Sequence, residues 1–326
     1  MKKIIPLLIV ALILYGSYAY LKDRLNKDET DTSTNTNQSA DTANNNSADN
    51  EGENSDIPAT DKNYFSQIVY YSDSNGYLVP VLRKLPKNAS LAKTTLSAMY
   101  TNKNNKDEIY HMGLAPTIPE NISITLALKE DGLIKVALSG EVMNIKDRAK
   151  EEAMLKSIVY TLTEFNNISK VQFLVNNTQA GVLGGGAIAS GTFLREDINA
   201  LNSAGKNRII LYYSNTFYPG FYVYPVTVYV NTLPGNALEL LNALTANSSK
   251  VKTNLSVKSE NIASAIIKDK KATVELKNIT GSSADIECIR KCIALTLCEN
   301  FELTSAEIII NGDSKNITLP IAPNEL

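Results

Sequence analysis

Histidine and tryptophan are almost missing from this sequence. The 326 residues contain no tryptophan and one histidine, His111, in a polar stretch that predicts an ordinary loop. Histidine-based catalysis and histidine metal centres therefore have almost nothing to work with. The three cysteines, Cys288, Cys292 and Cys298, fall within one expected helix, where neighbouring turns rarely allow a disulfide. We predict unpaired thiols, no metal site, no cofactor and no catalytic residue.

Excess charge and nucleotide-binding motifs are also missing. The formal net charge is −2, so there is no general basic character to attract nucleic acid, and we predict no nucleic-acid partner. The glycine-rich stretch VLGGGAIASG, residues 182–191, lacks the spacing of phosphate-binding loops. It predicts a linker, with a mobile binding loop as the alternative. Glu141, Asp147, Glu151 and Glu152 cluster before an expected helix, where the helix dipole explains acidic residues.

The N-terminal residues predict export. Lys2 and Lys3 precede an uncharged apolar run, Ile4 to Tyr20, which is at the short end for a transmembrane helix. We predict a signal anchor over residues 1–27 that crosses the cell membrane once and leaves the rest of the chain outside the cytoplasm. A cleaved signal peptide stays open, because Ser17-Tyr18-Ala19 offers small residues at the cleavage positions. Residues 28–62, rich in Asn, Asp, Ser and Thr, predict a disordered linker.

The remaining sequence contains a duplication. Residues 158–177 (IVYTLTEFNNISKVQFLVNN) and 293–312 (IALTLCENFELTSAEIIING) align at an offset of 135, with five identical residues in twenty positions. Tyr70-Tyr71 is matched by Tyr212-Tyr213, and Pro80-Val81 by Pro225-Val226, in the same order. The duplication predicts two tandem domains, at 63–180 and 207–322, joined by a glycine-rich segment at 181–206.

Each half predicts the order β-β-α-β-β-α-β. Alternating and helical periodicities support this order, as does an Asn-Gly turn at residues 75–76. The two amphipathic helices of each half should cover one face of a small sheet, which is an α+β fold. The first half predicts, in order, strands at 66–71 and 77–85, a helix at 89–100, a polar loop, a hairpin around Asp131-Gly132, a helix at 149–165 and a strand at 170–175.

Tyrosines concentrate on the first hairpin of each half. Exposed tyrosines on strands are good contact residues, so they form our candidate interaction surface. Packing across each hairpin is the alternative. The candidate residues are Tyr70, Tyr71, Tyr77, Tyr212, Tyr213, Tyr222 and Tyr224.

These features resemble the GerMN domain of sporulation and germination proteins. The resemblance rests on the strand ending in Tyr-Tyr, the Pro-Val in the second strand, the hairpin KEDGLIKVALSG and the closing stretch IVYTLTEFNNISKVQFLVNN. It covers Phe65 to Val175 and Arg208 to Leu319, and the second half departs from it by having Asn300 where the first has Phe165. The resemblance implies a fold similar to ring-building motifs, no active-site residues, and a place between mother-cell and forespore membranes. It also implies other sporulation membrane or channel proteins as partners.

Three functions remain open at this point. The first is a noncatalytic, membrane-tethered assembly protein that binds partner proteins and forms homo-oligomers. The second is an extracytoplasmic receptor for a small molecule or cell-wall glycan, with the loop at 181–191 closing on the ligand. The third is a wall hydrolase, whose only possible machinery is carboxylates.

Overall fold

The computed structural model describes residues 63–195, 197–217 and 220–326. The predicted anchor and linker, residues 1–62, lie outside this range and stay predictions. Among the described residues no helix has both the length and the apolar character needed to cross a membrane. Residues 63–326 form one compact unit, which we divide for description into a first half, 63–206, and a second half, 207–326.

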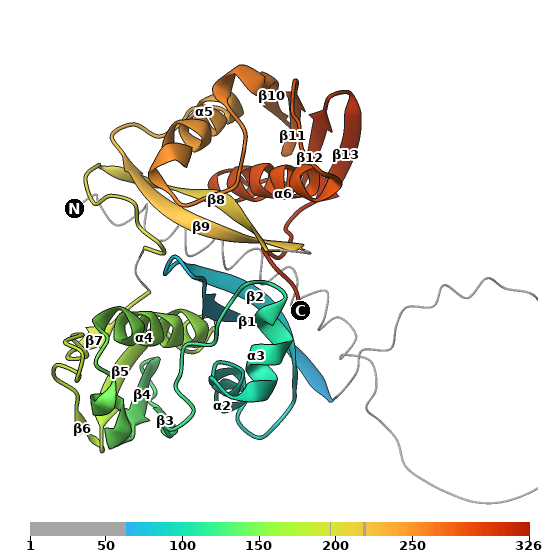
Figure 1. The fold of residues 1–326 in the computed structure, drawn as a ribbon. Coiled ribbons are helices and arrows are strands. Elements are labelled where there is room, and N and C mark those ends of the chain that lie inside the picture. Colours follow the sequence, from blue (N-terminus) through green and yellow to red (C-terminus); the bar gives the residue numbers. More distant parts are fainter. Residues whose placement is uncertain (1–62, 196, 218–219) are drawn as a thin grey trace, which may run out of the picture. The chain divides into compact units, whose positions relative to one another are not determined.

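The first half begins with a hairpin and continues with a larger sheet (Figure 1). The hairpin pairs β1 with β2, and the sheet has the order β3-β4-β5-β6, with β7 also paired to β5. β4 and β5 are parallel, with α4 between them in sequence, and the other neighbours are antiparallel. The elements are β1 (Tyr64–Ser72), β2 (Leu78–Pro86), α2 (Leu91–Ser97), α3 (Lys103–Tyr110), β3 (Ile124–Leu128), β4 (Leu133–Leu138), η1 (Gly140–Asn144), α4 (Arg148–Leu162), β5 (Lys170–Val175), β6 (Thr178–Gln179) and β7 (Thr192–Phe193).

The second half repeats this plan. A hairpin of β8 and β9 precedes a sheet of order β10-β11-β12-β13, in which β11 and β12 are parallel. The elements are β8 (Asn207–Phe217), β9 (Gly220–Val230), α5 (Ala237–Asn247), η2 (Ser248–Lys250), η3 (Ser259–Asn261), β10 (Ile262–Lys268), β11 (Lys271–Leu276), α6 (Ser283–Asn300), β12 (Ser305–Ile310) and β13 (Asp313–Thr318). The predicted mixed α+β class is confirmed.

The second helix of each half does not lie where the sequence predicted. We expected both helices of a half on one face of a single sheet, but each half has two sheets. α4 contacts both β1 and β5, while α6 contacts β8, β9 and β12 (Figure 1). Each helix therefore packs between the hairpin and the larger sheet of its half. Residues around most of the circumference of α4 are buried, because apolar surfaces lie on both sides.

Several elements were not predicted, among them α3, β6, β7 and β13. The polar loop contains α3, which begins after Asn102, whose side chain accepts a hydrogen bond from the Asn105 amide. Ile109 is its one fully buried side chain, so its apolar pattern is too sparse to detect. β6 and β13 add a strand after the last predicted strand of each half. In the second half the buried Arg290 of α6 holds β13 through its bonds to the Asp313 carboxylate and carbonyl, at 2.6 and 3.0 Å.

The repeated threonine links each helix to its hairpin. The Thr161 hydroxyl of α4 accepts a hydrogen bond from the Tyr70 amide at 3.1 Å, and Thr296 of α6 accepts one from Tyr212 at 2.9 Å. The threonine of each identical Thr-Leu pair therefore has a scaffold role. It accepts a hydrogen bond from an amide on the outer edge of a two-stranded sheet, which would otherwise lack a partner.

Candidate functional site

Most of the predicted tyrosine surface is buried within residues 63–326. Six of the seven side chains, all except Tyr77, are at most 7% exposed. The prediction of an exposed contact surface is thus corrected, because the two hairpins face other elements of the chain. Packing, the alternative reading, extends here beyond each hairpin to the contacts between the two halves.

The hydroxyl of the second tyrosine in each pair binds a backbone carbonyl at the C-terminal end of a helix. The Tyr71 hydroxyl donates to the Ala98 carbonyl at 3.2 Å, directly after α2. The Tyr213 hydroxyl donates to the Leu244 carbonyl of α5 at 2.9 Å. Burial raises the pKa of Tyr71 to about 12, so its hydroxyl stays protonated and remains a donor at neutral pH. These two residues have equivalent structural roles in the two halves.

The first tyrosine of each pair meets the repeated glutamate. The Tyr70 hydroxyl donates to the Glu164 carboxylate at 2.8 Å, and the Tyr212 hydroxyl donates to Glu299 at 3.4 Å. Arg195, which follows β7, makes an ion pair with Glu164 at 2.6 Å. The guanidinium also lies 5.4 Å from the centre of the Tyr70 ring. We name Tyr70, Glu164, Arg195, Tyr212 and Glu299 the Arg195 cluster.

The two carboxylates of the Arg195 cluster share one nearby arginine unequally. Burial lowers the pKa of Arg195, but Glu164 and Tyr70 outweigh that effect and raise it above its ordinary value. Burial raises the pKa of Glu299 to about 7; Arg195 and Tyr212 oppose the rise, and the negative charge of Glu164 adds to it. Glu299 is therefore the carboxyl of the cluster whose protonation is expected to change near neutral pH.

Aromatic and polar contacts cross between the halves near the first hairpin turn. The Tyr77 ring stacks on Tyr224, with centroids 4.7 Å apart and planes 17° apart. The Tyr222 hydroxyl donates to the Asp73 carboxylate at 2.8 Å. Asp73 also accepts the amides of Asn75 and Tyr77, so the turn of one hairpin is tied to a strand of the other.

Two asparagines bridge β2 and β9, which lie side by side (Figure 1). The Asn199 amide group pairs with both the N–H and the C=O of Leu78, each at 2.9 Å, and donates to the Pro225 carbonyl at 2.8 Å. Asn324 does the same in the opposite sense. It pairs with the N–H and C=O of Val223, at 2.8 and 2.7 Å, and donates to the Pro80 carbonyl at 2.8 Å.

The backbone beside each asparagine binds the opposite half. The Leu82 amide of β2 donates to the Asn324 carbonyl at 2.8 Å, and the Leu326 amide donates to the Leu82 carbonyl at 3.0 Å. On β9 the corresponding residue is Thr227, whose carbonyl accepts the Leu201 amide at 2.9 Å. We call residues 199–201 and 324–326, which both read Asn-x-Leu, the clasp segments. Together they join the outer edges of the two hairpins.

The glycine-rich loop binds a carboxylate of the chain itself. The Glu151 carboxylate of α4, which is fully buried, accepts the amides of Gly185 at 2.8 Å and Ala187 at 3.0 Å. A Cβ on Gly184 would lie 1.9 Å from the Met143 carbonyl oxygen, so only glycine allows this approach. Residues 184–187 form a loop, and beyond the predicted connection of the two halves this loop binds α4. The amides that would serve a phosphate or a ligand already hold Glu151.

The structure also places His111 and the three cysteines, which were singled out in the sequence. His111 is exposed at the end of α3. All three cysteines are free, and burial raises the pKa of Cys292, and that of Cys298 to about 11, which keeps these thiols protonated and poorly reactive. Among the described residues no group of histidine, cysteine or acidic side chains has the geometry of a metal site.

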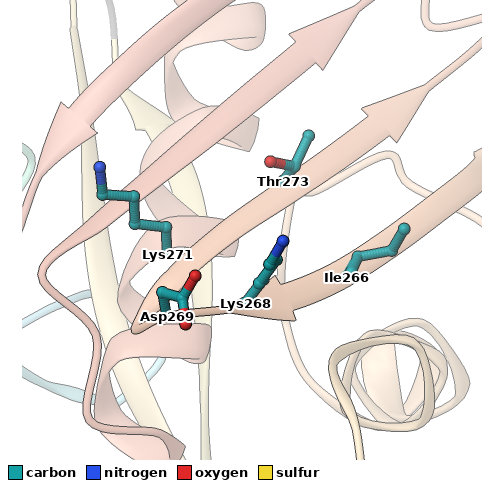
Figure 2. A pocket seen from close by; sticks show the side chains of 5 residues that line it. All are labelled: Ile266, Lys268, Asp269, Lys271 and Thr273. Atoms are coloured by element: carbon teal, nitrogen blue, oxygen red, sulfur yellow. The ribbon is translucent and has the colours of Figure 1, made fainter.

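A surface hollow of about 280 Å³ lies on the outer face of β10 and β11 (Figure 2). Its side chains come from paired positions of the two strands, Ile266 with Thr273 and Lys268 with Lys271, together with Asp269 at the turn. Ile266 is 62% exposed. Figure 2 shows these side chains standing on one hairpin with no opposing wall, and none of them is buried. The hollow is a gap between neighbouring side chains.

The strongest polar arrangement in the described chain is therefore the junction of the hairpins. The sequence pattern indicated its tyrosines, but it did not indicate the glutamates, Arg195 or the two asparagines as site residues. The one signal available was the pair of Asn-x-Leu triplets, which is too short to distinguish from chance.

Comparisons with known proteins agree with the resemblance to the GerMN domain. Residues 68–181 match the family described as "Sporulation and spore germination". The chain is 28% identical over 264 residues to the spore germination protein GerM of Bacillus subtilis (strain 168), covering 76% of this chain and 72% of that protein. It is also similar to the solved tandem GerMN domains of the B. subtilis sporulation protein GerM, with a TM-score of 0.57 and 24% identity, over 80% of this chain and 99% of that one. The predicted resemblance is confirmed.

Proposed function

Starting from a chain whose residues 68–181 match the sporulation and spore germination family, we propose a noncatalytic assembly protein of sporulation or germination. It acts outside the cytoplasm by binding other proteins, and the predicted N-terminal anchor tethers it to the cell membrane. Its partners are other membrane or channel proteins of the spore envelope. Each half would act as one ββαββαβ module of a tandem pair.

The observation that carries this proposal is that the internal polar side chains bind other parts of the same chain. Glu151 holds the glycine-rich loop, Glu164 pairs with Arg195, and Asn199 and Asn324 hold the hairpins together. These side chains contribute to stability and geometry, and their hydrogen-bonding capacity is spent within the chain. Two modules held in one fixed arrangement suit a protein that presents outer surfaces to partners. This use of the glycine-rich loop also removes the main support for the receptor alternative.

A deletion in the source organism tests the proposal. We expect normal vegetative growth with a loss of spore formation or a delay of germination, scored separately as heat-resistant counts and as loss of refractility. Complementation with Glu141→Gln should restore the wild-type phenotype, because the exposed Glu141 carboxylate would have no catalytic duty. A deletion strain that forms and germinates spores at wild-type levels would refute the proposed role in sporulation or germination. If the Glu141→Gln variant is present at normal levels but does not restore the wild-type phenotype, the wall-hydrolase alternative is open again.

Localisation needs its own measurement. We expect the full chain in the membrane fraction of sporulating cells, with residues 63–326 digested by protease added to the outer face of the membrane that carries the chain. A chain lacking residues 4–20 should remain in the cytoplasm. Finding the wild-type chain there as well would contradict the tether.

A further inference from the structure

The two clasp segments bind the two hairpins in equivalent ways. Each presents an asparagine side chain to both hairpins and its backbone to the hairpin of the opposite half. Asn199 follows the sheet of the first half, pairs by side chain with Leu78 of the same half, and precedes Leu201, which pairs with Thr227 of the second. Asn324 follows the sheet of the second half, pairs by side chain with Val223 there, and pairs by backbone with Leu82 of the first. Each segment therefore leaves its own half and contacts the hairpin of the other half.

The segment at 324–326 is held by few, well-defined contacts. In residues 320–326 only Asn324 is buried, at 4% exposed, while Glu325 is exposed and Leu326 is 37% exposed. Its site consists of backbone groups on the outer edges of the two hairpins, at Pro80, Leu82 and Val223. The contact is therefore a short extended peptide added beside a strand, with one asparagine as its specific element.

The connection to this site is also short. Five residues, 319–323, separate the last strand, β13, from Asn324. Fully extended, they span at most about 17 Å. The covalent connection adds nothing to the hydrogen bonds of the site, so the same bonds can be made by a segment that arrives from another molecule.

We propose that the site at Pro80, Leu82 and Val223 also accepts residues 324–326 of a second copy of this chain. Two chains then exchange these segments, and each completes the junction of the other. Closed and exchanged forms have the same hydrogen bonds at the site, which is the condition under which segment exchange costs little. Asn199 does not exchange, because the chain continues from it directly into β8. This inference rests on the contacts of the clasp segments and not on the biological process.

Cysteine crosslinking between two tagged copies of the full chain tests the exchange. Leu82 and Glu325 are neighbours in a parallel bridge. Neighbouring strands lie about 4.8 Å apart, within the Cα separations that a disulfide spans. One copy carries Leu82→Cys and the other carries Glu325→Cys, and the two are co-expressed and oxidised. A single chain with both substitutions is the positive control, and chains with only the native cysteines give the background.

The proposal expects a disulfide-linked dimer that contains both tags, well above background. Adding Asn324→Ala to the copy with Glu325→Cys should reduce the dimer at least several-fold, whereas adding Asn316→Ala, at an exposed position of β13, should not. An efficient link within the double variant, with no mixed dimer at any expression level, would mean that the segment binds only its own chain and would overturn the proposal. Absence of both links would overturn the site itself.

Discussion

Replacing Asn324 by alanine should weaken the whole unit and not only one loop. The side chain makes three hydrogen bonds of 2.7 to 2.8 Å, two with the Val223 backbone and one with the Pro80 carbonyl. It is 4% exposed, so water cannot easily replace the lost amide. The Val223 N–H and C=O lie on the outer edge of β9. Both form their hydrogen bonds across the junction with the Asn324 side-chain amide.

The expected loss follows from these three bonds. A hydrogen bond contributes about 0.5 to 1.5 kcal/mol net, and a buried group left without a partner costs about 1 to 3 kcal/mol. Partial rehydration at the edge limits the sum, and we expect Asn324→Ala to lower the free energy of unfolding by about 2 to 4 kcal/mol. In a domain of this length, about 2 °C of melting temperature corresponds to 1 kcal/mol, so Tm should fall by about 4 to 8 °C.

Scanning calorimetry of the soluble part, with Asn199→Ala and Asn316→Ala beside it, measures this loss. Asn199 makes the equivalent bonds at 2.8 to 2.9 Å and should give a comparable decrease. Asn316 is exposed on β13, and its replacement should change stability by less than about 0.5 kcal/mol. If Asn324→Ala and Asn316→Ala melt at the same temperature, the junction contributes nothing measurable and the reasoning fails.

Three further changes probe neighbouring contacts. Thr296→Val removes the acceptor of the buried Tyr212 amide and should cost about 1 to 3 kcal/mol in urea unfolding; a neutral effect would show that the amide finds another partner. Tyr222→Phe removes the bond to the Asp73 carboxylate and should cost about 1.5 to 3 kcal/mol by the same measurement, with an unchanged midpoint as the contrary result. Because the pKa of Glu299 is raised to about 7 when folded, the folded state binds the extra proton; its stabilisation is complete below the ordinary pKa and is lost as pH rises toward 7. Glu299→Gln should therefore gain stability relative to wild type as pH rises from 5 to 8 in a Tm series, and parallel curves would contradict the assignment.

The elements that the sequence predicted well are those whose pattern is local. β5 begins and ends as expected, at Lys170 and Val175, because its alternation and flanking polar residues lie within one short window. The helix α4 was also found, but its place between two sheets was not. Periodicity reports the strongest apolar stripe of a helix and is insensitive to a second, weaker contact face, here marked by Tyr160 and Thr161.

The candidate site depended on information that is not local. The tyrosines were recognised by type, yet their burial follows from hairpins that approach each other across more than a hundred residues of sequence. Glu151 was explained by the helix dipole, which is correct physics for its position at the start of α4. Its main role depends on Gly185 and Ala187, which are separated from it by the rest of α4 and by β5 and β6. Single polar residues with distant partners carry too little pattern to predict.

The two prolines of the junction have a consequence for how far such a structure can grow. Pro80 and Pro225 each lie on the outer edge of a hairpin, where a backbone N–H would otherwise face the other half. An edge with a gap in its donors cannot extend into a continuous ladder with another strand. The facing edges of β2 and β9 therefore meet through asparagine side chains, which donate to the carbonyls of the two prolines. The two hairpins stay separate two-stranded sheets, and no continuous backbone ladder grows across their junction.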